Sequence, residues 1–337
     1  MRLRSALLSL SVAVVGCIGS RPTPPHVAGS QESPSCSTRP FVETARFDEV
    51  YRKACHNCYE PSRSPSLSAA LDRVRSIEID FWDDHDLFGR SRPGAWYVRH
   101  GLTGGNKSNC SGNGDLAGCL GDVRMWSDAH PGHEVVTVYL DKKQGWGGGR
   151  RPADLDALLA RVFPRERIFT PGELKGEHPT LRAAAESSAW PTMESLHDKV
   201  VFVITGGGIF QSNRAQHQYV EQRGESALAF VAPGVDDVDE VTGAPDHFDA
   251  STAQWVVFYN LDHNGGHLGR TIREKHHVAR LWGTDEGAPI HLPSLAQCVN
   301  FVAHDRLDAT AAELHGVLVP RARTTERATI EALAPRF

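Results

Sequence analysis

The segment Ile77–Trp82, with the sequence IEIDFW, follows a helical pattern of apolar residues over Leu67–Val74. Its β-branched and aromatic residues predict a strand. Because alternate side chains of a strand share a face, Glu78 and Asp80 point the same way and the apolar side chains point the other way. Two neighbouring carboxylates repel each other, and their burial is costly unless a positive charge lies between them. A divalent cation is the simplest compensation, whereas two solvated carboxylates on an edge strand are the alternative.

Three other strand patterns end in residues of similar chemistry. Val135–Asp141 ends in a carboxylate, Trp96–His100 ends in a histidine, and Arg52–His56 ends in a second histidine. In a barrel of parallel strands, catalytic groups gather at the carboxyl ends of the strands, because the loops there are free to vary. We therefore expect these side chains to meet the Glu78 and Asp80 carboxylates at one end of a barrel.

Strand and helix patterns alternate along most of the chain. Helical patterns such as Pro152–Phe163 and Asn213–Arg223 lie between several strand patterns. This alternation predicts an α/β fold, a (β/α)8 TIM-type barrel formed by a single domain over residues 41–337. Because the first strand has the weakest pattern, a distorted barrel is expected. The predicted strands are Arg52–His56, Ile77–Trp82, Trp96–Arg99, Glu134–Leu140, Lys199–Thr205, Ala227–Val231, Gln254–Tyr259 and Val299–His304.

The N-terminal region has the pattern of an export signal. Residues 1–16 combine a basic start with an apolar run that is too short to span a bilayer, and we interpret them as a signal peptide. The residues before Cys17 resemble the cleavage box of bacterial lipoproteins, so Cys17 is the predicted lipidation site. Residues 17–40 are rich in Pro, Ser and Gly and predict a flexible tether. The protein is therefore expected to be exported and either lipid-anchored to a bacterial membrane or secreted.

Charge and cysteine content limit the possible partners of the protein and the compartment in which it works. The 337 residues carry a formal net charge of −5 and no long basic run, so we expect no nucleic-acid partner, and we expect a monomer. Lipidation of Cys17 leaves six of the seven cysteines, an even number that suits an oxidising compartment. Cys55 and Cys58 form a C-x-x-C pattern, but a redox site or a zinc site is not favoured there. No pairing is assigned to four of the cysteines: Cys36, Cys55, Cys58 and Cys298.

The same residues resemble a known enzyme family. The sequences around His56, Glu78, His100 and Asp141 look like phosphatidylinositol-specific phospholipase C, and the match is strong from about Cys55 to Trp146. The resemblance is to the secreted, calcium-dependent bacterial branch. The motifs that carry it are His56-Asn57-x-Tyr59, Glu78-x-Asp80, Arg99-His100-Gly101 and the segments 106–110, 117–120 and 126–133.

The resemblance implies a calcium-dependent phosphodiesterase. One Ca²⁺ ion, or less favourably Mg²⁺, is expected at the ligands Asn57, Glu78, Asp80 and Asp141. The animal branch has a glutamate where Asp141 stands, so coordination by the shorter side chain through water is an alternative to direct coordination. The substrate would be a phospholipid at a membrane surface. The resemblance also implies a disulfide between Cys110 and Cys119.

The implied reaction is attack by an inositol hydroxyl on the neighbouring phosphate, which gives a cyclic inositol phosphate and diacylglycerol. His100 is then the predicted general acid, His56 stabilises the phosphorane oxygen, and a carboxylate acts as the base. Lys143 shares a face with Asp141 on strict alternation and is the predicted substrate-binding residue. The acidic run Asp83–Asp86 is expected to be a solvated loop.

Two other functions remain open at this point. The first is a glycerophosphodiester phosphodiesterase or a phospholipase D-like enzyme, although such enzymes usually have Arg where Asn57 follows the first histidine. The second is a non-catalytic lipoprotein that binds a lipid or glycan. Headgroup specificity would depend on basic residues from late strands, for which Lys175, Arg214 and Arg270 are candidates by position.

Overall fold

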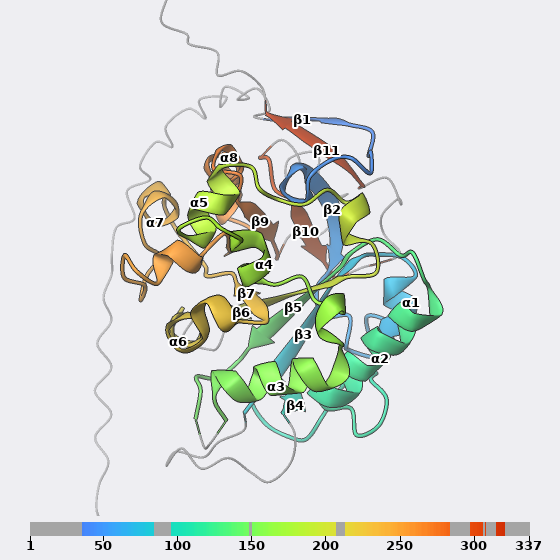
Figure 1. Cartoon of the computed structure of the whole chain (residues 1–337). Coiled ribbons are helices and arrows are strands. Elements are labelled where there is room, and N and C mark those ends of the chain that lie inside the picture. Colours follow the sequence, from blue (N-terminus) through green and yellow to red (C-terminus); the bar gives the residue numbers. More distant parts are fainter. Residues whose placement is uncertain are drawn as a thin grey trace, which may run out of the picture. The chain divides into compact units, whose positions relative to one another are not determined.

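The computed structural model describes residues 36–83, 96–147, 150–206, 213–283, 297–305, 307 and 315–320. Eight parallel strands form a barrel with helices around it (Figure 1), which confirms the predicted fold class. In spatial order the strands are β7 (Ala229–Val231), β6 (Val200–Gly206), β5 (Val136–Lys142), β3 (Ser76–Trp82), β2 (Val50–Cys55), β10 (Phe301–His304), β9 (Val278–Leu281) and β8 (Phe258–Leu261).

The barrel is nearly closed. The two end strands, β7 and β8, are not joined by a ladder within the described residues. One backbone hydrogen bond crosses the gap, from the Asn260 nitrogen to the Pro233 oxygen at 3.0 Å. The expected distortion therefore lies between β7 and β8. The first strand, β2, had the weakest sequence pattern but pairs with both of its neighbours.

The prediction for Trp96–Arg99 was wrong. Only Tyr97–Val98 forms a strand there, β4, and it pairs antiparallel with the end of β3 instead of entering the barrel. The eighth barrel strand is β9 (Val278–Leu281), which was not predicted because it is short and carries the charged Arg280 in its apolar run. As a result β3 and β5 are direct neighbours, with Asp80 opposite Asp141 in the parallel register.

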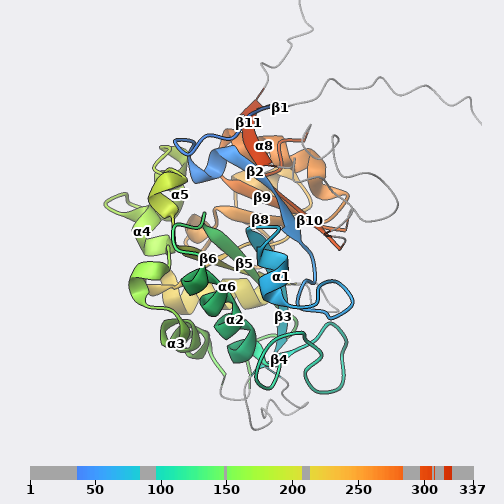
Figure 2. The ribbon, with the colours of Figure 1, turned by 90° about the vertical axis from the view of Figure 1, so that its right-hand side faces the viewer.

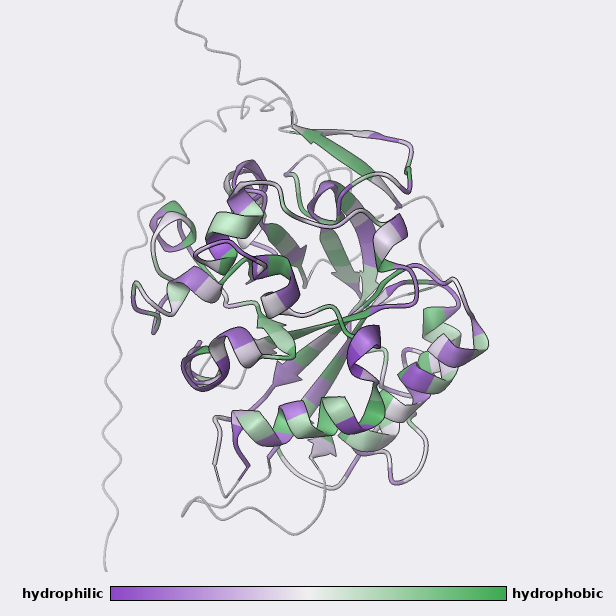
Figure 3. Ribbon diagram, viewed as in Figure 1, coloured by the Kyte–Doolittle hydropathy of each residue, from purple (hydrophilic) through white to green (hydrophobic). Residues whose placement is uncertain are grey.

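Helices cover the outside of the barrel (Figures 1 and 2). Side-chain caps explain several of their starts: Ser66 accepts a hydrogen bond from the Ala69 nitrogen, and Asp115 accepts one from the Gly118 nitrogen. Hydrophobic and hydrophilic residues alternate in bands along α2 and α3 (Figure 3), which leaves each helix one apolar face for the sheet. The helices are α1 (Leu67–Leu71), α2 (Leu116–Ala129), α3 (Pro152–Val162), α4 (Pro171–Lys175), α5 (Leu181–Glu186), α6 (Arg214–Arg223), α7 (Val238–Thr242) and α8 (Gly269–Glu274).

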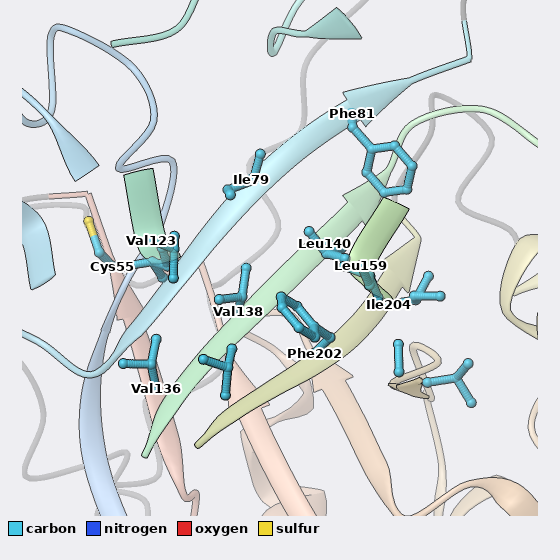
Figure 4. Packing of buried hydrophobic residues seen from close by; sticks show 14 of the residues in the cluster. Cys55, Ile79, Phe81, Val123, Val136, Val138, Leu140, Leu159, Phe202 and Ile204 are labelled. Atoms are coloured by element: carbon cyan, nitrogen blue, oxygen red, sulfur yellow. The ribbon is translucent and has the colours of Figure 1, made fainter. Parts of the chain in front are cut away.

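Alternation along the strands divides the core into an outer and an inner layer. One set of side chains from β3, β5 and β6 packs against Val123 of α2 and Leu159 of α3, in a single buried cluster (Figure 4). The other set points into the barrel, where Tyr139 contacts Phe301 edge to face. Glu78 is opposite Tyr139 in the register, so alternation places Glu78, Asp80 and Asp141 in the barrel interior.

The described N-terminal segment belongs to the sheet. β1 (Cys36–Arg39) pairs antiparallel with β11 (His315–Pro320), which in turn pairs with β2, and a disulfide joins Cys36 to Cys298. Cross-strand pairing and a disulfide thus hold residues 36–39, which were predicted to belong to the tether over residues 17–40. The predicted signal peptide and Cys17 lie outside the described residues. Within the described parts of the chain, no helix is long and apolar enough to cross a membrane.

Candidate active site

The site lies in a cavity at the carboxyl ends of the barrel strands. His56 follows β2, His100 follows β4, and Asp141 and Lys143 lie at the end of β5. With Glu78 of β3, the cavity thus joins five of the predicted site residues, whereas Asn57 and Asp80 are not among the residues that line it. Chain segments far apart in the sequence complete its lining, including Asn260, Arg280, Trp282, Asp236, Glu240, Asp246 and Asp262.

Three buried carboxylates form the centre of the site. Ligand oxygens of Glu78, Asp80 and Asp141 all lie within 4.8 Å of one another. Asp141 was expected two strands along the barrel from Asp80, but the loss of β4 from the barrel makes their strands adjacent. Three like charges at this spacing need compensation in a buried site.

Two basic side chains provide part of that compensation. The Lys143 Nζ atom lies 2.9 Å from Asp80 Oδ2 and also donates to Asp141 Oδ2. Arg280, whose side chain is only 1% exposed, pairs with Glu78 Oε2 and donates to Asn260 Oδ1 at 2.6 Å. Burial raises the pKa of Asp141, but the charge and hydrogen bond of Lys143, together with Arg280 and Thr205, outweigh burial and lower it. Burial raises the pKa of Asp80, and Lys143 and His100 do not fully offset this effect.

Two oxygens of the predicted ligand set are buried without a partner. Asn57 Oδ1 and Asp80 Oδ1 have no hydrogen bond to any described residue. An unpaired buried polar atom is costly, so both oxygens are suited to a ligand that the protein itself does not supply. Asn57 reaches this position with a left-handed backbone, at φ 57°. One amide oxygen and three carboxylates are the donor chemistry that Ca²⁺ prefers.

Each histidine is held by a carboxylate. His56 Nδ1 lies 2.7 Å from Asp305 Oδ1, and its Nε2 lies 3.6 Å from Glu78 Oε2. Burial lowers the pKa of His56, but the Glu78 charge and the Asp305 hydrogen bond outweigh burial and raise it. His100 Nδ1 lies 3.1 Å from Asp80 Oδ2, and that hydrogen bond raises the pKa of His100 more than burial lowers it. Both imidazoles are therefore disposed to carry a proton.

Comparisons with known proteins decide the family. The family model for calcium-dependent phosphoinositide phospholipase C matches residues 106–232. A solved calcium-dependent phosphoinositol-specific phospholipase C from the Gram-negative bacterium Pseudomonas sp. shares 34% identity, with a TM-score of 0.74, over 86% of this chain and 100% of that chain. The chain belongs to the calcium-dependent phosphoinositide phospholipase C family.

A second solved member shows the same fold at lower identity. The calcium-dependent phosphatidylinositol-specific phospholipase C from Streptomyces antibioticus is 23% identical, with a TM-score of 0.69, over 81% of this chain and 99% of that chain. No curated protein sequence matches the chain at a significant level.

The family assignment makes this phospholipase C an enzyme of the phosphodiesterase type. Its cofactor is Ca²⁺, for which the buried acidic triad offers oxygen ligands.

Several residues of this phospholipase C lie where the sequence did not predict them. Asp83 was expected in a solvated loop, but it is fully buried and pairs with Lys142, while Asp84–Asp86 lie outside the described residues. The candidates for headgroup recognition, Lys175, Arg214 and Arg270, do not line the cavity. Arg280 does line it. A single arginine within an apolar strand pattern is the signal that would have identified this residue, because a buried charge needs a partner.

Three disulfides lie within the described residues. The predicted pair Cys110–Cys119 is one of them, with the sulfurs 2.00 Å apart. The cysteines left open by the sequence form Cys36–Cys298 and Cys55–Cys58. The second of these closes the short loop that carries His56 and Asn57, so the C-x-x-C pattern flanks two predicted site residues directly.

Proposed function

We propose that this enzyme cleaves phosphatidylinositol-type lipids by intramolecular attack, which releases diacylglycerol and a cyclic inositol phosphate. The observation that carries the proposal is that His56 and His100, each held by a carboxylate, line one cavity with Glu78 and Asp141 of the acidic triad. This arrangement supplies two proton-bearing groups beside a cation site, as cleavage of a phosphodiester requires. The relatives that support it are described as specific for phosphoinositol or phosphatidylinositol.

Each residue has a proposed role in this reaction. Asn57, Glu78, Asp80 and Asp141 would hold the calcium ion, which when bound lowers the pKa of the attacking hydroxyl and neutralises charge on the phosphate. A carboxylate of the triad accepts the proton of the inositol hydroxyl, whose oxygen forms the new bond to phosphorus. Protonated His100 donates its proton to the diacylglycerol oxygen as the old bond breaks.

The remaining two groups act on the phosphate. The His56 imidazolium, held between Glu78 and Asp305, stabilises negative charge on a phosphorus oxygen. Lys143 lines the cavity and would contact the phosphate of the bound substrate. Both roles require positive charge, which agrees with the raised pKa of His56 and the carboxylates that surround Lys143.

Product analysis tests the proposal. The purified enzyme is given phosphatidylinositol vesicles with calcium, and the products are followed by phosphorus NMR, with a chelator-treated sample as the control. We expect a cyclic phosphodiester and diacylglycerol. Glycerol phosphate or a free headgroup would instead indicate a glycerophosphodiesterase or phospholipase D-like reaction. Binding of vesicles with no turnover under any metal condition would indicate a non-catalytic lipoprotein.

We infer further that the enzyme is exported and works as a monomer at a membrane surface, without a nucleic-acid partner. Three disulfides favour an oxidising compartment. Residues 1–16 would be the signal peptide and Cys17 the lipidated residue, with the catalytic domain beginning near Cys36. Cys17→Ser should release the enzyme from the membrane fraction and abolish labelling by a fatty-acid analogue. An unlabelled wild-type protein found in the medium would support secretion.

A further inference from the structure

Lys143 lies within the carboxylate cluster and not at its edge. Its side chain is 11% exposed, and its Nζ atom bridges Asp80 Oδ2, at 2.9 Å, and Asp141 Oδ2. Its backbone nitrogen donates to the Phe81 oxygen at 3.0 Å, so the main chain is fixed between β3 and the end of β5. Because the main chain is fixed, the Lys143 ammonium can move only by rotation about its side-chain bonds.

The oxygens that Lys143 contacts overlap with those proposed to bind calcium. The other oxygen of Asp141, Oδ1, accepts a hydrogen bond from the Thr205 hydroxyl at 3.2 Å. A cation bound by Asp141 Oδ2 would therefore share that oxygen with the Lys143 ammonium. Asp80 Oδ2 likewise serves both Lys143 and His100, whereas Asp80 Oδ1 has no partner within the described structure.

The charges around the carboxylate cluster indicate that a bound calcium ion and the Lys143 ammonium would replace each other. Glu78 is compensated by Arg280, and Asp80 and Asp141 are compensated by Lys143. A divalent cation at these two aspartates would lie close to the ammonium, and like charges at such a separation repel strongly in a buried site. The lysine stem is flexible, so the ammonium can leave without a change of the backbone.

We propose that Lys143 is a displaceable counter-ion of the calcium site. Its ammonium holds Asp80 and Asp141 together when calcium is absent, and binding of the ion requires the ammonium to leave them. The proposal rests on the ligand set named under the proposed function. It implies that Lys143 stabilises the calcium-free enzyme and lowers its calcium affinity. The substrate-binding role predicted for Lys143 then belongs to the calcium-loaded state.

Calcium binding measured by titration calorimetry tests this proposal with Lys143→Met. The variant should bind calcium at least about ten-fold more tightly than the wild type, because the competing cation is gone. Its thermal midpoint without calcium should fall, and saturating calcium should restore it. Lys275→Met is the matched control, because Lys275 pairs with Glu186 outside the cavity, and its calcium affinity should be unchanged. A folded Lys143→Met with unchanged or weaker calcium binding would overturn the proposal.

Amine labelling of the wild-type enzyme gives a second test that does not depend on the variant folding. Lys143 should react slowly without calcium and several-fold faster with it, as measured by peptide mass spectrometry. An equal rate in both states would overturn the exchange. The ligand set is tested separately with Asp80→Asn. If that variant binds calcium normally, the ligand set fails; if it binds weakly while Lys143→Met binds like the wild type, only the exchange fails.

Discussion

The Nδ1 atom of His56 lies 2.7 Å from the Oδ1 atom of Asp305, although 249 residues separate them in the sequence. The parallel register of β2 and β10 places Cys55 opposite His304. The residues that follow them, His56 and Asp305, therefore meet at the same edge of the barrel. Arg63 also pairs with Asp305, at 3.1 Å. The carboxylate is therefore held in place and favours the imidazolium form of His56.

Asp305→Asn should shift the pH dependence of the reaction. Burial lowers the pKa of His56, while Glu78 and Asp305 raise it above its usual value. Since the proposed role of His56 requires its protonated form, kcat/KM should be lost as pH rises through this raised pKa. Removal of the Asp305 charge lowers the pKa, so the alkaline limb should move to lower pH. The profile of kcat/KM against pH measures this shift, with the surface variant Asp128→Asn as the control. A profile that does not move would contradict the proposed role.

Each of the two proposed catalytic histidines should be essential for turnover but not for folding. His56→Ala and His100→Ala should each reduce kcat by about 10²- to 10⁴-fold, the usual contribution of a positioned acid or base. The His100 side chain is 60% exposed, so its loss leaves no buried cavity. His130→Ala, at the end of α2, is a control of similar exposure. Circular dichroism checks the fold, and near-normal rates in both variants would refute the site assignment.

The sequence was sufficient for much of the fold because strand alternation is a local property. It placed Glu78 and Asp80 on one face, and both are buried in the barrel interior. It failed at Trp96–Arg99, because a β-rich composition does not reveal whether a strand pairs parallel or antiparallel. It also missed β9, where a four-residue strand carries the buried Arg280. Both errors concern which strands become neighbours, and that depends on tertiary pairing.

The site illustrates the same limit. The proposed calcium ligands come from short motifs on consecutive strands, so spacing identifies them as candidates. The basic residues that compensate their charge cannot be identified by spacing, because Arg280 lies 202 residues from Glu78 in the sequence. Lys143 was assigned to the substrate because its face was predictable, whereas its contact with Asp80 depends on the adjacency of β3 and β5.

Metal removal and one conservative substitution test the proposed ligands. Exhaustive chelation should abolish activity, and Ca²⁺ should restore it better than Zn²⁺, since oxygen ligands suit the harder ion. Asp80→Asn removes one charge at nearly constant shape, so we expect calcium affinity to fall by at least about ten-fold. Glu225→Gln removes an exposed carboxylate outside the cavity and is the control. Full activity after chelation would instead favour a mechanism in which Lys143 alone neutralises the phosphate.

The Cys55–Cys58 disulfide should contribute to calcium binding. It closes the loop that holds His56 and the left-handed Asn57, and both sulfurs are buried. A paired Cys55→Ala and Cys58→Ala variant should leave this loop freer, so calcium affinity and kcat should both decrease. Cys110→Ala with Cys119→Ala is the matched control, because that disulfide closes a loop that does not line the cavity. Equal calcium affinity in the two paired variants would show that the Cys55–Cys58 bond has no positioning role.

Carboxylates on the cavity wall should make the enzyme prefer an unphosphorylated headgroup. The same cavity that His56 and His100 line is also lined by Asp236, Glu240, Asp246 and Asp262. Carboxylates accept hydrogen bonds from the hydroxyls of a neutral inositol ring and repel additional phosphates. Plain phosphatidylinositol should therefore be cleaved faster than its mono- and bisphosphorylated forms in matched vesicles, and the difference should shrink at high salt.

Variants that remove charge test whether the carboxylates on the cavity wall cause this headgroup preference. Glu240 is not suitable, because its carboxylate accepts hydrogen bonds from the backbone nitrogens of Asp236 and Asp246. Asp236 and Asp246 are exposed, so Asp236→Asn with Asp246→Asn should leave the fold intact. Cleavage of the phosphorylated lipids should rise several-fold relative to phosphatidylinositol. Asp239→Asn is the control, because this exposed residue of α7 does not line the cavity. An unchanged ratio of kcat/KM values would mean that the shape of the cavity, and not its charge, determines headgroup selection.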